Sequence, residues 1–229
     1  MRKAEIHNTA VILPVYNSSR HLRMLTEKLQ GYFPLEQILA VDDGSTDASA
    51  ESCRELGLHL IRFTRNKGKG AALTAGFTEA SSLGYEFAFS IDSDEQHAPE
   101  HIPAFLAKQQ STGAGLVLGF RQLTFKDMPF ARICSNRLTS FIVSLTIGQQ
   151  VSDSQCGYRL YRLADLADLK FKTLRYQFET EILLKLAAKN VKIAEVPVIT
   201  IYGDETSHIS HFRDIRNFVK VVTGHWFKK

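Results

Sequence analysis

The chain has 229 residues, of which 44% are hydrophobic and 23% are charged, and its formal net charge at pH 7 is +4. This composition is ordinary for a globular protein with a substantial core, and no basic run interleaved with aromatic residues indicates a nucleic-acid partner. The three cysteines are widely spaced and form no CxxC pair, which argues against a disulfide framework or a structural zinc site and favours a reducing compartment.

Short apolar runs alternate with helical patterns in the first half of the chain. Four successive strand–helix–strand steps predict an α/β fold, with a Rossmann-like, largely parallel sheet covered by helices on both faces. The expected strands cover residues 10–15, 38–41, 58–63, 87–91 and 115–119, and the expected helices cover residues 19–32, 47–56, 70–83 and 99–110.

The second half is less regular but contains no linker, internal repeat or low-complexity stretch, so we expect one domain over residues 1–229. Its pattern predicts a long helix, a strand, an amphipathic helix, an extended segment around Pro197 and a final helix. These elements are expected over residues 128–147, 157–161, 176–189, 191–201 and 212–227.

Two carboxylates, Asp92 and Asp94, lie just outside the expected strand 87–91. In open α/β sheets ligands bind at the carboxyl ends of the strands, and side chains at i and i+2 of an extended segment point the same way. Two hard oxygen ligands facing one point suit Mg²⁺ or Mn²⁺, which also binds substrate phosphates. The alternative is a polar turn that caps the helix after Pro99, because aspartates are common in turns.

Other strand ends also carry polar segments, and their convergence on one edge of the sheet is what a nucleotide crevice needs. Residues 14–17 follow the first strand, residues 42–47 the second and residues 119–121 the fifth. We expect Asp42 and Asp43 to bind the nucleotide and Thr46 or Asp47 to cap the following helix, although turn chemistry alone also explains this segment.

A basic, glycine-bearing loop at residues 65–70 precedes a predicted helix. Such a loop can hold phosphate at a helix N-terminus. It fits neither the P-loop nor the GxGxxG pattern, and a solvated turn explains Lys67 equally well.

Together these segments resemble glycosyltransferase family 2, which has the GT-A fold. The first half carries the resemblance through VILPVYN (11–17), VDDGSTD (41–47), RNKGKG (65–70) and DSDEQH (92–97). The second half is similar to the polyprenyl-phosphate, or dolichyl-phosphate mannose synthase-like, branch through GFR (119–121), DSQCGYR (153–159), FETE (178–181) and EVPV (195–198). Two departures are Ser18, where that branch often has an acid close by, and the lack of a transmembrane tail that some relatives carry.

The resemblance implies a metal-dependent, inverting transferase that moves a hexose from GDP-mannose or a UDP-sugar to a polyprenyl phosphate. Residues 1–120 would bind the nucleotide sugar and residues 121–229 the acceptor. The implied metal ligands, for Mg²⁺ or Mn²⁺, are Asp92, Asp94 and Gln96. The implied nucleotide-sugar residues are Pro14, Tyr16, Asn17, Asp42, Asp43, Lys69, Asp92, Ser93 and His208. The implied acceptor-phosphate residues are Arg121, Arg132 and Ser135, and the implied catalytic residues are Asp94, Arg121, Asp153 and Glu181.

Two other functions remain open. A phosphate acceptor is already anionic and needs cations to hold it, whereas a hydroxyl acceptor on a glycan or lipid needs a carboxylate base. Asp153, Glu179 and Glu181 are candidates for that base; the two glutamates do not share a helical face, so at most one is expected to face the site. A non-catalytic nucleotide-binding module is the third possibility, and the intact metal triplet argues against it.

Several arginine and histidine residues have alternative roles. Arg132 is equally compatible with a surface position on a helix, and Arg159 with a structural pair to Asp153. His97 and His101 are spaced i, i+4 and could bind a transition metal, but Pro99 lies between them and no HExxH pattern exists, so zinc is not favoured.

The end of the chain suggests contact with a membrane. Residues 202–210, which include His208, resemble the loop that closes over the donor in this branch. In residues 212–227 an apolar stripe opposes basic residues, as in helices that lie on anionic membranes. The apolar run 141–147 could take part in the same membrane contact. The alternative is that residues 212–227 form a helix packed on the core. Without a signal peptide or about 20 consecutive apolar residues, we expect a cytoplasmic protein, peripheral on the inner face of the membrane and serving the cell envelope.

Overall fold

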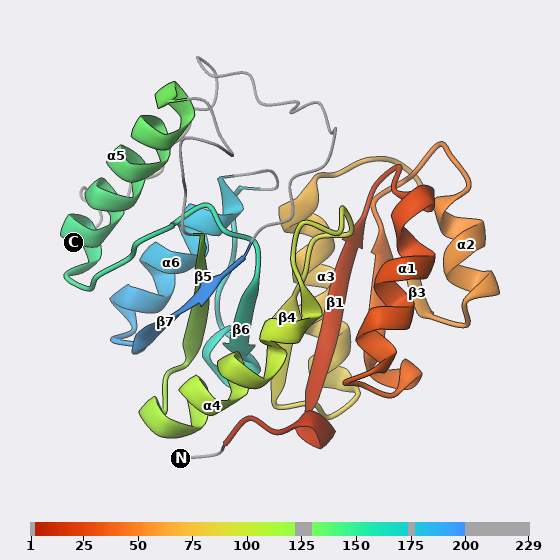
Figure 1. The fold of residues 1–229 in the computed structure, drawn as a ribbon, viewed down its shortest axis with the longest axis horizontal. Helices are drawn as coiled ribbons and strands as arrows, with labels where there is room; N and C mark the ends of the chain where they lie inside the picture. Colours follow the sequence, from red (N-terminus) through yellow and green to blue (C-terminus); the bar gives the residue numbers. More distant parts are fainter. Residues whose placement is uncertain (1–2, 122–129, 174–176, 200–229) are drawn as a thin grey trace.

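The computed structural model describes residues 3–121, 130–173 and 177–199, which form one mixed sheet with helices packed on it (Figure 1). The strands are β1 (Thr9–Val15), β2 (Ile38–Asp42), β3 (His59–Arg62), β4 (Phe87–Ser90), β5 (Leu116–Arg121), β6 (Arg159–Arg162) and β7 (Ile193–Val198). The α-helices are α1 (Ser19–Gln30), α2 (Ser49–Glu55), α3 (Lys69–Ser82), α4 (Ile102–Thr112), α5 (Phe130–Ile147) and α6 (Phe178–Ala188). Short 3-10 helices cover Ile6–Asn8, Leu35–Gln37, Pro99–His101 and Leu163–Asp165.

The strand order is β3-β2-β1-β4-β6-β5-β7, and most neighbouring strands run parallel, as predicted. The exception is β6, which pairs antiparallel with both β4 and β5. The expected strand 157–161 begins later than predicted, at Arg159. The carboxyl ends of β1, β2 and β4 therefore meet at one edge of the sheet, as the sequence predicted.

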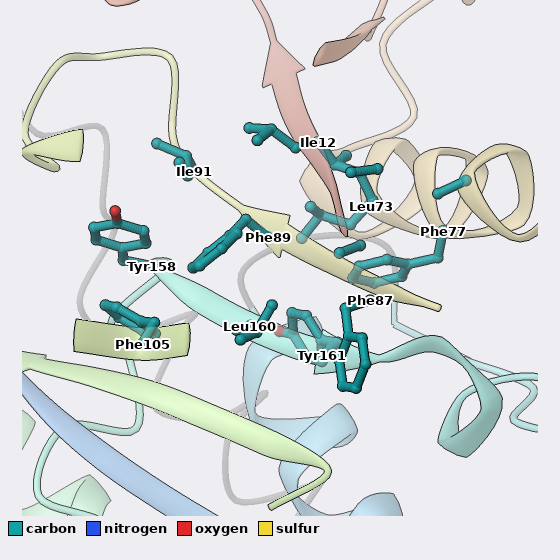
Figure 2. Close-up of a cluster of buried hydrophobic side chains, with 14 of the residues drawn as sticks. Ile12, Leu73, Phe77, Phe87, Phe89, Ile91, Phe105, Tyr158, Leu160 and Tyr161 are labelled. Carbon is teal, nitrogen blue, oxygen red and sulfur yellow. The ribbon is translucent and has the colours of Figure 1, made fainter. Parts of the chain in front are cut away.

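The two faces of the sheet carry separate layers of the core, since successive side chains of a strand point to opposite faces. On one face the Phe89 ring packs edge-on against Phe33 and Phe105, with ring centroids 6.0 and 5.6 Å apart. On the other face Phe77 of α3 packs against Tyr161, with centroids 4.9 Å apart (Figure 2). Helices on both faces are thus confirmed.

Helix boundaries differ from the expected ones by a few residues, and the N-cap position of α2 is Ala48 instead of Thr46 or Asp47. Asp47, one of the two residues expected to cap α2, accepts hydrogen bonds from the backbone N–H of Ser49 at 2.9 Å and of Ser19 at 3.3 Å. Thr46 instead donates its backbone N–H to Asn17 Oδ1 at 2.9 Å. The expected helix 212–227 lies outside the described residues.

Among the residues that the structure describes, no helix is both long enough and apolar enough to cross a membrane.

Candidate active site

The loops that follow β1, β2 and β4 are joined to one another by hydrogen bonds. Ser93 donates its hydroxyl to the carbonyl oxygen of Pro14 at 3.0 Å, and the backbone N–H of Asn17 donates to Ser45 Oγ at 3.0 Å. Asn17 has a φ of 52°, a left-handed conformation that asparagine tolerates better than most residues. Tyr16 beside it is 47% exposed. The structure therefore gathers Pro14, Tyr16, Asn17 and Ser93 at one edge of the sheet, and their contact with a nucleotide sugar stays a prediction.

Asp43 joins the loops that follow β2 and β3. Its two carboxylate oxygens accept the backbone N–H groups of Lys67 and Gly68 at 2.7 and 2.8 Å, which fixes the basic loop 65–70. Gly44 allows the close approach, since a Cβ there would lie 2.5 Å from the backbone carbon of Arg65. Contact of Asp43 with a nucleotide remains a prediction.

The neighbouring Asp42 does not fit its expected role as a nucleotide ligand. Its side chain is fully buried, its Oδ2 lies 3.1 Å from Nε of Arg62, and its Oδ1 accepts the backbone N–H of Ser45 at 3.0 Å. The carboxylate thus lies below the protein surface, with Oδ1 hydrogen-bonded to the loop and Oδ2 in an ion pair with Arg62. Asp42 therefore supports the loop instead of facing a ligand.

A shared lysine connects Asp92 to α6. The Lys69 ammonium lies 2.6 Å from Asp92 Oδ1 and 2.6 Å from Glu179 Oε1. Burial opposes the charge of Lys69, but the two carboxylates outweigh burial and raise its pKa. Burial likewise works against ionisation of Asp92, and the adjacent Lys69 charge still holds the pKa of that carboxyl far below its usual range. Both groups are therefore charged at neutral pH.

The expected metal ligands are two carboxylates and one amide. Asp94 Oδ1 accepts the backbone N–H of Gln96 at 3.1 Å, which turns the segment after β4 back on itself. Within the described ranges, no three histidine, cysteine, aspartate or glutamate side chains are grouped to hold a metal ion. Mg²⁺, however, typically binds one or two carboxylates together with substrate phosphates and waters. The hard oxygen donors of Asp92 and Asp94, one already facing a cationic group, fit such an ion.

The two histidines considered as zinc ligands face different partners. His97 is buried, its Nε2 lies 3.5 Å from Asp92 Oδ2, and its ring packs on Tyr158 with centroids 5.3 Å apart. His101 Nε2 instead accepts the backbone N–H of Ile199 at 3.0 Å. The pair is thus not assembled into a common site.

Arg121 and Asp153 form a buried ion pair at the end of β5. Asp153 is 1% exposed and accepts Arg121 Nε at 2.6 Å, Arg121 Nη2 at 3.1 Å and the amide nitrogen of Asn136 at 3.0 Å. Burial alone would raise the pKa of Asp153, but its bonds to Arg121 and Asn136 lower it. A carboxylate bound in this way is a poor proton acceptor. These contacts favour a role for Asp153 in positioning Arg121, and its expected catalytic role stays a prediction.

Arg159 does not pair with Asp153, which was its alternative role in the sequence. Its fully buried guanidinium donates to the carbonyl oxygens of Cys156, Ser154 and Glu179 at 2.7, 2.8 and 3.0 Å. Arg159 therefore ties the segment before β6 to the start of α6.

Glu179, and not Glu181, reaches the site. Glu181 accepts the backbone N–H groups of Lys172 and Thr173 at 2.9 and 2.7 Å, and Lys185 Nζ lies 2.6 Å from it. Burial favours a higher pKa for Glu181, but these bonds lower it. The expectation that at most one of the two glutamates faces the site is consistent with this geometry. The contacts of Glu181 do not favour the catalytic role expected of it, which stays a prediction.

Gly157 is a site residue that the sequence reasoning did not single out. A Cβ at this position would lie 2.5 Å from Asp92 Oδ2 and 2.7 Å from Lys69 Nζ. The backbone of Gly157 is fixed by Ser90, which donates its hydroxyl to the Gly157 carbonyl at 2.6 Å. The only signal in the sequence was a glycine within the polar segment 153–159.

The expected acceptor-phosphate residues are only partly described. Ser135 lies on α5, where its carbonyl oxygen accepts the Thr139 hydroxyl at 3.0 Å. Arg132 belongs to the same helix, but its side chain lies outside the described part, as do His208 and the expected loop 202–210. Of the apolar run 141–147, Phe141 is exposed to solvent.

Comparisons with known proteins agree on the family and the fold. Residues 10–169 match the family described as Glycosyl transferase family 2. The UDP-N-acetylglucosamine–dolichyl-phosphate N-acetylglucosaminyltransferase of Methanococcus voltae is 30% identical over 216 residues, which cover 85% of this chain and 86% of that one. The polyprenol monophosphomannose synthase of Mycolicibacterium smegmatis is 29% identical over 202 residues, which cover 83% and 76%.

Among solved structures, glucosyl-3-phosphoglycerate synthase from Mycobacterium tuberculosis in complex with Mg²⁺ and uridine diphosphate superposes with a TM-score of 0.74 at 16% identity, over 95% of this chain and 79% of that chain. At this identity the likeness concerns the fold, and it confirms the expected GT-A fold.

Proposed function

We infer that this chain moves a hexose from a nucleotide diphosphate sugar to a polyprenyl phosphate. The premise is its family, since the chain belongs to glycosyl transferase family 2 and is therefore a glycosyltransferase. An oxygen of the acceptor phosphate attacks the anomeric carbon, the bond from that carbon to the diphosphate breaks, and the nucleoside diphosphate leaves. A single displacement of this kind inverts the anomeric centre.

The acceptor assignment draws on the relatives. One is named for transfer to dolichyl phosphate and another for synthesis of polyprenol monophosphomannose. A further relative, from Micrococcus luteus, is named undecaprenyl-phosphate mannosyltransferase. Two different sugars occur in these names, so the relatives support a common class of acceptor and leave the donor as GDP-mannose or a UDP-sugar.

The observation that carries this proposal is the state of the candidate bases. Within the part of the chain that the structure describes, Asp153 is bound by Arg121, Glu181 by Lys185 and two backbone N–H groups, and Glu179 by Lys69. A hydroxyl acceptor would need one of them to take its proton, whereas a phosphate acceptor is already anionic near neutral pH, with a second pKa of about 6. The engaged carboxylates favour the phosphate.

Arg121 is the cation that would hold that acceptor phosphate. Its guanidinium is oriented by Asp153 at the carboxyl end of β5, and a planar fork of donors suits a phosphate group. Asp92 and Asp94, with Gln96, would hold Mg²⁺ or Mn²⁺, and the bound ion would offset the charge that develops on the leaving diphosphate.

A lipid-linked acceptor requires the site to reach a membrane surface. We therefore include in this proposal a peripheral position at the inner face of the membrane, with contact through residues 212–227. These residues lie outside the described part of the chain.

A transfer assay tests the function. Purified protein, Mn²⁺ and a panel of radiolabelled GDP- and UDP-sugars are incubated with a polyprenyl phosphate or, as the matched control, with the corresponding polyprenol, and the organic phase is counted. We expect label only with the phosphate. Label with the polyprenol would favour a hydroxyl acceptor, and no nucleotide release with any acceptor would contradict the assignment.

A further inference from the structure

Lys69 stands at an unfavourable position for a cation, as the first residue of α3. The N-terminus of a helix carries the positive end of the helix dipole, which disfavours a nearby positive charge. The ammonium nevertheless lies 2.6 Å from both Asp92 Oδ1 and Glu179 Oε1. Two carboxylates from different elements therefore stabilise a lysine that its own helix does not.

Close packing fixes this arrangement. A Cβ on Gly157 would lie 2.7 Å from Lys69 Nζ, and a Cβ on Gly70 would lie 2.7 Å from Cβ of Phe178, next to Glu179. The start of α3 therefore lies against the start of α6 at Gly70, and the segment before β6 lies against Lys69 and Asp92 at Gly157. This packing keeps the ammonium within reach of both carboxylates.

The two carboxylates differ in exposure and in support. The Glu179 side chain is 8% exposed and that of Asp92 is 24% exposed. The Glu179 backbone carbonyl accepts the buried Arg159 guanidinium at 3.0 Å, which anchors this residue in the interior. Glu179 is thus the inner, fixed partner of Lys69, and Asp92 is the outer one that faces the ligand edge of the sheet.

We propose that Lys69 is an internal counter-ion that holds Asp92 in the absence of donor, and that a divalent cation takes Asp92 while Lys69 stays on Glu179. This proposal rests on the proposed metal-dependent function. Because the ammonium already offsets the charge of Asp92, the metal ion alone binds weakly. The diphosphate of the donor supplies additional negative charge and ligand oxygens, so metal and nucleotide binding are coupled.

Direct titration with Mn²⁺ tests the exchange without any turnover. Mn²⁺ binding is measured by calorimetry, with and without uridine diphosphate or guanosine diphosphate, on the wild type and on the Lys69→Met and Glu179→Gln variants. Lys189→Met is the control, because Lys189 follows the end of α6 and lies 3.9 Å from the exposed Asp168 carboxylate.

We expect Lys69→Met to bind Mn²⁺ without nucleotide at least about fivefold more tightly than the wild type, the lower end of typical coupling between sites. In the same variant the nucleotide still tightens Mn²⁺ binding, because that gain comes from the diphosphate oxygens, which the substitution does not change. Glu179→Gln leaves Lys69 on Asp92 alone and therefore weakens Mn²⁺ binding, while Lys189→Met binds as the wild type does.

The outcomes separate the two proposals. If the wild type binds no Mn²⁺ even with nucleotide, the proposed metal dependence is wrong. If the wild type binds Mn²⁺ and Lys69→Met binds it equally or more weakly, the counter-ion role is wrong. Circular dichroism checks that the variants fold. If Lys69→Met does not fold, Glu179→Gln alone tests the exchange, and unchanged or tighter Mn²⁺ binding in Glu179→Gln would reject it.

Discussion

The guanidinium of Arg121 holds Asp153 through two bonds, from Nε to Oδ2 at 2.6 Å and from Nη2 to Oδ1 at 3.1 Å. The two residues lie 32 positions apart and meet at the carboxyl end of β5. A two-pronged pair of this kind fixes the plane of the guanidinium as well as its position. Asp153, a candidate general base in the sequence, therefore orients Arg121, the arginine expected to bind the acceptor phosphate.

The Asp153 pair predicts a pH-dependent stability. The pKa of Asp153 is lowered in the folded protein, so its contribution is complete above the unfolded value of about 3.9 and is lost as the pH falls through the folded value. Asp153→Asn should lower the free energy of unfolding at pH 7 by about 3 kcal/mol, the scale for breaking a buried pair. Urea unfolding at pH 7, 5 and 3 should show this difference shrinking at the lowest pH.

The matched control for that experiment is Asp168→Asn, because the Asp168 side chain is 90% exposed and lies 3.9 Å from Lys189. An exposed pair at this distance contributes little. A difference between wild type and Asp153→Asn that stays constant from pH 7 to pH 3 would show that the charge of Asp153 is not what stabilises the fold.

Asp94→Asn should remove transfer while leaving the fold intact. The substitution keeps the size of the side chain and its acceptor for the backbone N–H of Gln96, but it replaces a carboxylate by a neutral amide. We expect kcat to fall about 100-fold or more, as when other electrostatic stabilisers of a transition state are removed. Unchanged turnover, with a wild-type circular dichroism spectrum, would contradict the metal mechanism.

Gly157→Ala should impair donor use more than stability. The added Cβ would meet Asp92 Oδ2 and Lys69 Nζ at 2.5 and 2.7 Å, so the pair must separate. We expect kcat/KM for the nucleotide sugar to fall about tenfold or more, since small displacements at a reacting centre are costly. Gly31→Ala at the end of α1, where the closest contact is 3.2 Å, is the control and should transfer normally.

Arg159→Lys should destabilise the protein although it keeps the charge. The guanidinium satisfies three buried carbonyl oxygens at once, and a lysine ammonium cannot reproduce its planar fork. We expect the free energy of unfolding to fall by about 3 kcal/mol, as when buried acceptors lose charged donors. Arg54→Lys, in the exposed pair with Glu51, should change it by less than about 0.5 kcal/mol, and equal effects would argue against the role of Arg159.

The cysteines should react with a thiol reagent in two classes. Burial raises the pKa of the Cys53 and Cys156 thiols to about 12, whereas Cys134 is exposed. The thiolate is the reactive form, so one thiol should react rapidly in native protein and two only after unfolding. Rapid reaction of all three in native buffer would show that the core around Cys53 and Cys156 opens readily.

Local patterns in the sequence determined the fold and the edge of the sheet at which the candidate site lies. The alternation of apolar runs and helical periods predicted the sheet, because burial of a face requires that period. Asp92, Asp94 and the segments at 14–17 and 42–47 could be assigned to one edge, because carboxyl ends of parallel strands meet there. The antiparallel β6 was not predictable, since strand direction depends on where the chain returns to the sheet.

Only the tertiary structure decided which partner each carboxylate binds. Glu179 and Glu181 look alike in the sequence, yet Glu179 reaches a lysine 110 positions away while Glu181 caps the chain eight and nine residues before it. Asp42 and Asp43 are adjacent, yet one is buried on Arg62 and the other holds the loop after β3. Ion pairs and buried hydrogen bonds form between residues that only the folded chain brings together, and a carboxylate's chemistry follows from that partner.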